Sequence, residues 1–401
     1  MMRRSLALAG LLLLLLTGLA GCGGGDDGSA DTSGSDDPLP TPQIGSSGDQ
    51  PQASQQLGFP GFATKNTTRV GGADAVANAA AIARAVYPGG APNTQPPAVA
   101  IADQDNWQAG LAAAVLMSSP LRAPLLLSDG TSLPQASDDA LRALAPTGER
   151  ALGGVQVVRI GSDTPAPGGF RSTTIDGRDP AVLAAAIDRF QSAAAGRPTR
   201  AVMIASSEDP AFAMPAAAYA AKSGTPVLFV SRDTIPGATF AALRAHGRPR
   251  IYVLGPETVI SSDVERALRG LGTVTRVSGE DAVRNSIAFA RYSDGAFGWG
   301  VVDPGHGLVF ANDRSPEDAA VAAPLSASGT YGPLLLLDDA ATLPLPLGEY
   351  LLDIQPGYER DPVRGVYNHA WLIGDEAAIS LPVQSRIDSL LEISPVRTSQ
   401  P

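Results

Sequence analysis

Three stretches of the chain share one order of apolar and polar positions. Each begins with an apolar run of strand length, continues into an Ala-rich segment of helical length, and ends with a proline followed by a second apolar run. The three prolines, Pro124, Pro226 and Pro333, are 102 and then 107 residues apart. A period of this length indicates repeated domains rather than a solenoid of short repeats.

Two further features keep the same register in all three stretches. A second proline follows ten or eleven residues later and predicts a new helix, since the first helical turn leaves the missing N–H group unpaired anyway; these prolines are Pro134, Pro236 and Pro344. A third apolar strand then closes on a glycine: Gly161, Gly255 and Gly374. The runs after the first prolines predict core strands that bury Leu126, Leu228 and Leu335.

Each repeat opens with a short strand, a glycine and an Ala-rich helix, beginning near Thr67, Thr173 and Thr275. Gly71 and Gly72 do not start a phosphate-binding motif, so we interpret them as a turn. Strands that alternate with helices of this length predict β-α-β units with right-handed crossovers. The predicted fold class is therefore α/β, with three tandem small parallel-sheet, Rossmann-like sandwiches.

The chain has 401 residues, with 29 basic and 40 acidic side chains and a net charge of −11, which disfavours nucleic acid as a partner. Its single cysteine, Cys22, follows Arg3, Arg4, an apolar run and the sequence Leu-Ala-Gly. This pattern predicts an export signal. It resembles a bacterial lipobox, which implies cleavage before Cys22 and diacylation of its sulfur. The alternative is an ordinary buried or free thiol.

Composition changes abruptly after Cys22 to Gly, Ser, Asp, Pro and Gln, which predicts a disordered tether. An exported, lipid-anchored chain would lie outside the cytoplasm, held to the membrane and facing the cell wall. The expected organisation is a signal peptide at 1–21, a tether at 22–65, repeats at 66–165, 166–272 and 273–394, and a tail at 395–401.

The triple register resembles the type 2 cell wall-binding repeat family of Gram-positive surface proteins. The third repeat carries DAAVAAPL from Asp318 to Leu325 and then Gly-Pro-Leu-Leu, which fits the family pattern well. The first and second repeats keep Ala-Pro-Leu-Leu-Leu and Thr-Pro-Val-Leu around Pro124 and Pro226. Ala109 and Ala211 stand where the third repeat has Asp318. The resemblance implies binding to an anionic wall glycopolymer and a pseudo-threefold packing of the repeats.

Ligands of open parallel sheets bind in loops at the carboxyl ends of the strands. The candidate ligand-binding residues, which include the aspartate of the family pattern, are Asp103, Asn106, Ser206, Arg232, Asn312, Arg314 and Asp318. Arg232 and Arg314 are the cations among these loops and can offer forked donors to phosphate or carboxylate groups. The alternative for both is an ion pair with the adjacent aspartate or a solvated side chain.

The chain is not expected to be an enzyme. Its three histidines occur in no metal-binding spacing, and no G-x-S-x-G motif occurs. No cofactor and no metal are predicted. The main hypothesis is a non-catalytic wall-binding lipoprotein whose partners are a wall glycopolymer and, through its lipid, the membrane. A solute-binding lipoprotein for a small molecule is the alternative, and a wall-modifying enzyme is the weakest of the three.

Overall fold

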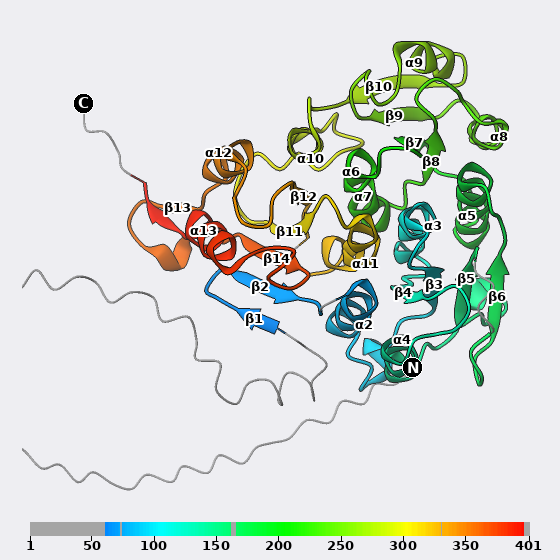
Figure 1. Cartoon of the computed structure of the whole chain (residues 1–401), viewed down its shortest axis with the longest axis horizontal. Coiled ribbons are helices and arrows are strands. Elements are labelled where there is room, and N and C mark those ends of the chain that lie inside the picture. The colour runs from blue at the N-terminus through cyan, green and yellow to red at the C-terminus, as the bar shows by residue number, and fades with distance from the viewer. Residues whose placement is uncertain (1–60, 73, 162–165, 330, 397–401) are drawn as a thin grey trace, which may run out of the picture. The chain divides into compact units, whose positions relative to one another are not determined.

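A computed structural model describes residues 61–72, 74–161, 166–329 and 331–396 of the chain (Figure 1). The predicted signal peptide and Cys22 lie outside the described residues. The predicted tether lies outside them up to residue 60. Ordered structure begins earlier than its expected end at residue 65, because β1 (Gly61–Ala63) pairs antiparallel with β2 (Thr67–Val70).

Three sheets carry the fold, and each has the same internal order. In each, the strand that follows the first proline lies at one edge and pairs with the first long apolar strand, which pairs in turn with the Gly-terminated strand. The first sheet has the order β4-β3-β5-β6, the second β8-β7-β9-β10 and the third β12-β11-β14-β2-β1. All named pairs in these sheets are parallel except β1 with β2, which confirms the α/β class.

The strands of the first sheet are β3 (Val99–Asp103), β4 (Leu125–Ser128), β5 (Val157–Ile160) and β6 (Ser172–Ile175). Those of the second are β7 (Ala201–Ser206), β8 (Val227–Val230), β9 (Arg250–Leu254) and β10 (Thr273–Val277). The third sheet adds β11 (Gly307–Asn312), β12 (Leu334–Leu337) and β14 (His369–Ile373) to β1 and β2. A separate short pair joins β13 (Gly357–Tyr358) to β15 (Ser394–Pro395).

The opening strand of each repeat completes the sheet of another repeat. β6 pairs with β5 of the first repeat, β10 pairs with β9 of the second, and β2 pairs with β14 of the third. The repeats were expected to be self-contained sandwiches, and in this respect the structure differs. A periodic sequence defines the length of the repeating unit but not the point at which one folded unit ends and the next begins.

Helices follow the strands in the predicted alternation. The longer ones include α2 (Ala75–Val86), α3 (Trp107–Ala113), α4 (Gln135–Leu144), α5 (Pro180–Ala194), α7 (Pro215–Ser223), α8 (Gly237–Ala245), α10 (Ala282–Arg291), α11 (Pro316–Ala327), α12 (Leu345–Asp353) and α13 (Leu381–Leu391). The shorter ones are α6 (Pro210–Ala213), α9 (Ser262–Leu268), η1 (Pro92–Thr94), η2 (Ala114–Met117), η3 (Arg150–Leu152) and η4 (Pro362–Arg364). As predicted, the second prolines immediately precede helices α4, α8 and α12.

Three equivalent helices, α3, α7 and α11, pack against one another (Figure 1). Their alanines let the helix axes approach closely, and a Cβ added at Gly110 of α3 would lie 3.3 Å from the Cβ of Ala320 of α11. One continuous apolar cluster therefore includes residues from all three repeats. Leu126, Leu228 and Leu335 are fully buried, which confirms the predicted core strands.

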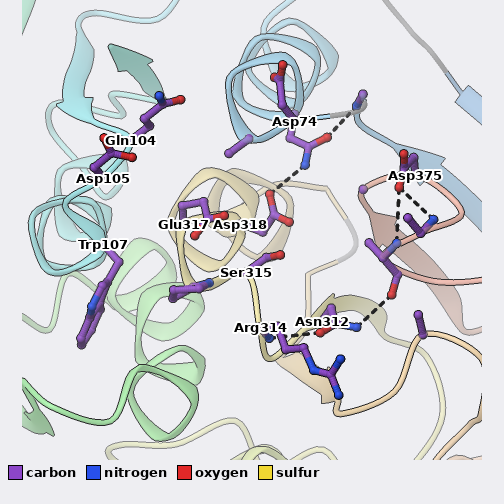
Figure 2. A pocket seen from close by; sticks show the side chains of 18 residues that line it. Asp74, Gln104, Asp105, Trp107, Asn312, Arg314, Ser315, Glu317, Asp318 and Asp375 are labelled. Carbon is purple, nitrogen blue, oxygen red and sulfur yellow. Dashed lines mark hydrogen bonds between the residues drawn. The ribbon is translucent and has the colours of Figure 1, made fainter. Parts of the chain in front are cut away.

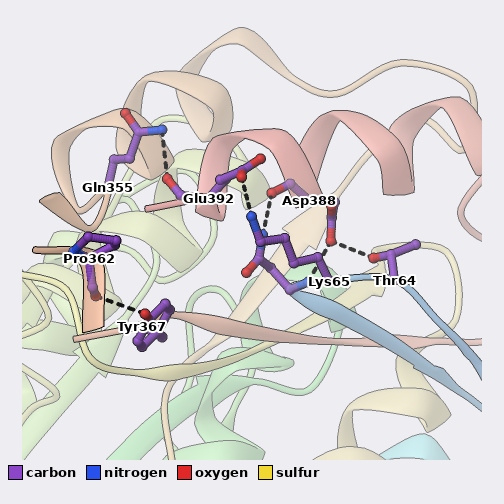
Figure 3. Close-up of polar contacts among 8 residues, drawn as sticks. Thr64, Lys65, Gln355, Pro362, Tyr367, Asp388 and Glu392 are labelled. Carbon is purple, nitrogen blue, oxygen red and sulfur yellow. Dashed lines mark hydrogen bonds and ion pairs between the residues drawn. The ribbon is translucent and has the colours of Figure 1, made fainter. Parts of the chain in front are cut away.

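The first and last parts of the described chain are joined by polar contacts (Figure 3). Asp388 of α13 accepts hydrogen bonds from the Thr64 hydroxyl and from the Asn66 backbone N–H, the latter at 2.7 Å. Lys65 forms an ion pair with Glu392. These contacts hold β1 and β2 against α13, so the third sheet is completed by the first residues of the folded region.

We expect Leu335→Ala to lower the free energy of unfolding by about 2–5 kcal/mol, because it removes a fully buried side chain from β12. Chemical denaturation measures the change. Leu345→Ala is the matched control, since this leucine is 74% exposed and its loss should cost less than about 0.5 kcal/mol. Equal losses in the two variants would contradict the placement of β12 in the core.

Candidate functional site

A cleft of about 680 Å³ lies at the carboxyl end of the third sheet, where the first and third repeats meet (Figure 2). The third repeat contributes the loop after β11 and the loop after β14. The first repeat contributes the turn before α2 and the loop after β3. The residues labelled in the figure are Asp74, Gln104, Asp105, Trp107, Asn312, Arg314, Ser315, Glu317, Asp318 and Asp375. We call this the acidic cleft.

Asn312 shapes the floor of the acidic cleft at the end of β11. Its side-chain nitrogen donates to the Ala378 carbonyl at 3.0 Å, and its side-chain oxygen accepts from the Arg314 N–H at 3.1 Å. The amide thus ties the loop after β11 to the loop after β14. Only 5% of Asn312 is exposed, so its contribution is to position the loop that carries Arg314.

Arg314 presents an exposed guanidinium to the acidic cleft. This group makes no hydrogen bond or ion pair to any residue that the structure describes. Its charge nevertheless affects its neighbour: burial and the charge of Asp338 raise the pKa of Asp313, and Arg314 opposes them. Of the two alternatives expected, an ion pair with Asp313 is not formed, and the side chain is solvent-exposed, which leaves the guanidinium accessible to a ligand.

Asp318, near the start of α11, is 4% exposed and forms a polar link between the third and first repeats. Its Oδ1 accepts a hydrogen bond of 2.8 Å from the Asn78 side chain, whose own oxygen accepts one of 2.6 Å from the Gly72 N–H. Burial raises the pKa of Asp318 to about 7, although the bond from Asn78 opposes this shift. Asp318 thus serves the junction as well as lining the cleft.

In the part of the chain that the structure describes, the corresponding contacts between the other repeats involve no carboxyl group. In the third repeat, Asn285 occupies the place of Asn78, accepting from the Gly279 N–H at 3.3 Å and donating to the Phe212 carbonyl at 3.3 Å. A backbone carbonyl therefore replaces the carboxylate there. In the second repeat the equivalent residue is the buried Leu183, which packs at Gly177.

The remaining predicted residues act within their own loops. Asp103 accepts from the Asp105 N–H at 3.0 Å, and Asn106 caps α3 by accepting from the Ala109 N–H at 3.0 Å. Their neighbours Gln104, Asp105 and Trp107 line the acidic cleft instead. Ser206 is fully buried and accepts from the backbone N–H groups of residues 208 and 209.

Arg232 lies in the second repeat and is not among the residues that line the acidic cleft. It pairs with Asp233 at 3.1 Å and donates to the Thr258 carbonyl at 3.1 Å. The alternative expected from the sequence, an ion pair with the adjacent aspartate, is thereby confirmed. The structure brings Asn312, Arg314 and Asp318 together, and it places Arg232 and Ser206 elsewhere.

The excess of acidic side chains in the acidic cleft was not predicted from the sequence. Five carboxyl groups and one guanidinium line it, and four of these acids, all exposed or half-buried, were not predicted as site residues: Asp74, Asp105, Glu317 and Asp375. Asp74 and Asp375 follow the glycines that close strands β2 and β14, so their spacing from those glycines was an available signal. Trp107 packs edge-on against Phe229, with 5.9 Å between ring centroids, as expected for a packing aromatic.

Two arginines that were not predicted from the sequence, the buried Arg69 and the half-buried Arg276, support two of the loops. Arg69 of β2 donates to the carbonyls of Gly374, Asp375 and Ile379 at 2.6 to 2.9 Å. Arg276 of β10 makes the equivalent contacts to the carbonyls of residues 255 and 260. The shared sequence Thr-Arg-Val followed two residues later by Gly was the signal for this role.

Within the described residues, no group of three or more His, Cys, Asp or Glu side chains is arranged to hold a metal ion. The helices in that part of the chain are also too short or too polar to cross a membrane. The acidic cleft offers hydrogen-bonding groups: carboxylates and amides that can accept from hydroxyls, and one guanidinium that can donate.

We expect Asp318→Asn to change the pH dependence of stability. The carboxyl has a pKa of about 7 in the folded protein and about 3.9 in the unfolded chain, so between these values the folded state holds a proton that the unfolded chain has lost. Stability of the wild type should therefore fall as pH rises through this window, and the asparagine variant should lack that fall.

The expected difference is about 1–3 kcal/mol between pH ~5 and pH ~8, measured by urea unfolding. The variant retains an amide oxygen that accepts from Asn78. Asp105→Asn, at an exposed carboxyl of the same cleft, is the matched control and should follow the wild type. Parallel curves for Asp318→Asn and the wild type would show that the carboxyl is not proton-linked to folding.

Comparisons with known proteins agree with this architecture. Residues 174–265 match the family model described as Cell wall binding domain 2 (CWB2). The chain is 32% identical over 126 residues, 31% of its length, to the amidase enhancer of Bacillus subtilis (strain 168), of which it covers 16%. Thus the chain spans less than a fifth of that relative.

Two solved structures, Cwp6 and Cwp8 from Clostridium difficile, are similar in fold. Each superposes with a TM-score of 0.62 at 18% sequence identity over 82% of this chain. The match covers 48% of Cwp6 and 52% of Cwp8, so this chain spans about half the length of either protein. Residues 174–265 are thus similar to the cell wall-binding domain 2 family, and the likeness to the two solved structures is one of fold.

Proposed function

We propose that this chain is a non-catalytic lipoprotein whose three repeats bind an anionic glycopolymer of the cell wall. The observation that carries the proposal is the match of residues 174–265 to the cell wall-binding family model. Such a domain acts outside the cytoplasm, in association with the wall. The amidase enhancer, which this chain resembles over part of its length, is named for enhancing an amidase and not for catalysis.

The acidic cleft supports a glycan as the ligand. Its carboxylates and the Gln104 amide offer acceptors to sugar hydroxyls, and the Trp107 ring adds an apolar surface beside them. Arg314 is the donor suited to an acidic substituent, because its guanidinium has no partner in the described residues. Asn312 and Asp318 position these groups, as do Asp103 and Asn106 in the loop after β3.

A solute-binding lipoprotein is the second candidate. A volume of about 680 Å³ falls within the usual range for small-molecule sites. The family match favours the wall polymer, since a repeated module suits a repetitive ligand and linked weak sites raise each other's effective concentration. Saturable binding of a small molecule, with no retention on purified walls, would favour the solute receptor.

The proposed anchor is a lipid on Cys22, which lies outside the described residues. We expect mass spectrometry of the protein from the native envelope to show a mature N-terminus at Cys22 that carries a diacylglyceryl group. Cys22→Ala should prevent this processing. Recovery of the native protein with an unmodified Cys22 thiol would contradict the anchor without affecting the wall-binding proposal.

We expect Arg314→Ala to weaken retention of the 61–401 fragment on purified cell walls by roughly 3–10-fold and to reduce its dependence on salt. The reason is the loss of the one unpaired guanidinium in the acidic cleft, while an exposed side chain contributes less than about 1 kcal/mol to folding. Sedimentation with walls, before and after removal of their secondary polymers, measures retention.

Two arginines of the second repeat serve as controls for this experiment. Arg232→Ala removes a guanidinium already paired with Asp233, so its effect should be smaller than that of Arg314→Ala. Arg266→Ala removes an exposed arginine of α9 that pairs with Asp263 and should leave retention unchanged. Equal retention of all variants across a salt titration would remove Arg314 from the site.

A further inference from the structure

A second cavity, of about 740 Å³, lies at the amino ends of the strands of the second sheet, the edge opposite to the one that carries ligand loops. Arg200 immediately precedes β7, and Arg250 is the first residue of β9. The walls of the cavity include the carboxyl ends of helices α5 and α7. Arg197 lies just beyond α5, and Lys222 lies in the last turn of α7. We call this the basic cleft.

The positive charges of the basic cleft are largely uncompensated. Arg197 and Arg200 are exposed and make no side-chain hydrogen bond or ion pair within the described part of the chain. Lys222 lies 3.1 Å from the centroid of the Tyr331 ring, a contact that leaves its charge in place. Arg250 has an electrostatic attraction to Asp294. The carboxylate of Asp294 also accepts a hydrogen bond of 2.5 Å from the Tyr252 hydroxyl.

The one carboxylate among the described residues lining the basic cleft is already occupied. Asp188 lies 2.8 Å from Nε2 of His246, and the other ring nitrogen of His246 lies 2.8 Å from the Thr199 carbonyl. Burial lowers the pKa of His246, but Asp188 and the Thr199 carbonyl outweigh burial and leave it raised. Asp188 therefore balances the histidine rather than the arginines.

Helix ends account for part of this charge. The carboxyl ends of α5 and α7 carry partial negative charge, which Arg197 and Lys222 complement. Arg200 and Arg250 lie at strand starts and have no such role. The Arg250 N–H donates to the Arg200 carbonyl at 2.9 Å, so the two residues adjoin, and both line the basic cleft.

The arginines of the basic cleft occur in the second repeat and not at the equivalent positions of the other two. By strand register, Pro97 and His306 stand where Arg200 stands, and Gln156 and His369 stand where Arg250 stands. Burial lowers the pKa of His369, which disfavours its charged form. Against a net charge of −11 and an acidic cleft with one guanidinium, the second repeat concentrates cations at this edge.

We propose that the basic cleft binds most of the oxyanion groups, phosphate or carboxylate, of the polyanionic glycan, and that the acidic cleft takes sugar hydroxyls together with the one acidic substituent that Arg314 can bind. This inference rests on the proposed function and divides the work between two faces. Arginine forks bind phosphate and carboxylate oxygens through paired hydrogen bonds. Any anionic group beyond the one bound by Arg314 would face four carboxylates and the buried Asp318 in the acidic cleft.

The test uses the full mature chain in detergent with three probes: poly(glycerol phosphate), polygalacturonate and neutral dextran. We expect the wild type to bind at least one of the two polyanions with an affinity that falls as salt rises, and to bind dextran without such dependence. The double variant Arg200→Gln/Arg250→Gln should lose at least about tenfold in polyanion affinity, the effect of losing two charge-assisted contacts.

The matched control is Arg142→Gln/Arg266→Gln, which removes the same charge from two exposed arginines paired on their own helices. Thermal unfolding of both double variants checks that the fold is kept. Equal losses of polyanion affinity in the two variants would attribute binding to overall charge and overturn the inference. The polymer whose binding the Arg200/Arg250 variant loses, phosphate or uronate, identifies the oxyanion.

Failure of this inference is separate from failure of the proposed function. If the Arg200/Arg250 variant keeps its polyanion affinity while the wild type is still retained on purified walls, the basic cleft is excluded and wall binding stands. If the wild type binds neither the polyanions nor the walls, both proposals fall. If the Arg314 variant loses retention on walls while the Arg200/Arg250 variant is retained like the wild type, the whole polymer is assigned to the acidic cleft. That result would overturn the role proposed for the basic cleft.

Discussion

The pairing of each opening strand with a neighbouring repeat is the constraint on which the rest of the structure depends. β6, β10 and β2 pair with backbone groups of β5, β9 and β14 that would otherwise be left at the edge of each sheet. The third sheet takes its missing strand from the first residues of the folded region, so β2 and β14 pair across almost the entire described chain. That contact carries the largest loop-closure entropy of the sheets and is reinforced by the Asp388 and Lys65 contacts.

The same constraint determines where the sites lie and why their chemistry differs. Two of the junctions join the helix after an opening strand to a helix of another repeat, α11 or α6, so their polar residues come from two repeats. At one junction Asn78 meets Asp318, whereas at another Asn285 meets a backbone carbonyl. The backbone architecture repeats three times while the side chains at the junctions do not, and this difference distinguishes one cleft from another.

Much of the fold could be predicted from the sequence, because prolines, glycines and apolar runs act locally. The strands after Pro124 and Pro333, and the helices after the second prolines, are examples. The exchange of strands could not be predicted, since periodicity carries no information on which edge a strand joins. For the site, local spacing identified Arg314 but could not separate it from Arg232, because an ion pair depends on rotamers and neighbours rather than on sequence order.

The position of β1 and β2 has a mechanical consequence. Any pull on the folded region from its N-terminal side enters through β1, a three-residue strand bonded to β2 alone within its sheet. Such a load would break the pairing of β1 with β2 before it acts on the pairing of β2 with β14. β2 is held more firmly, by parallel pairing with β14 and by the buried Arg69 guanidinium on three carbonyls. β1 would therefore separate first under such a load, ahead of β2, whose pairing with β14 completes the third sheet.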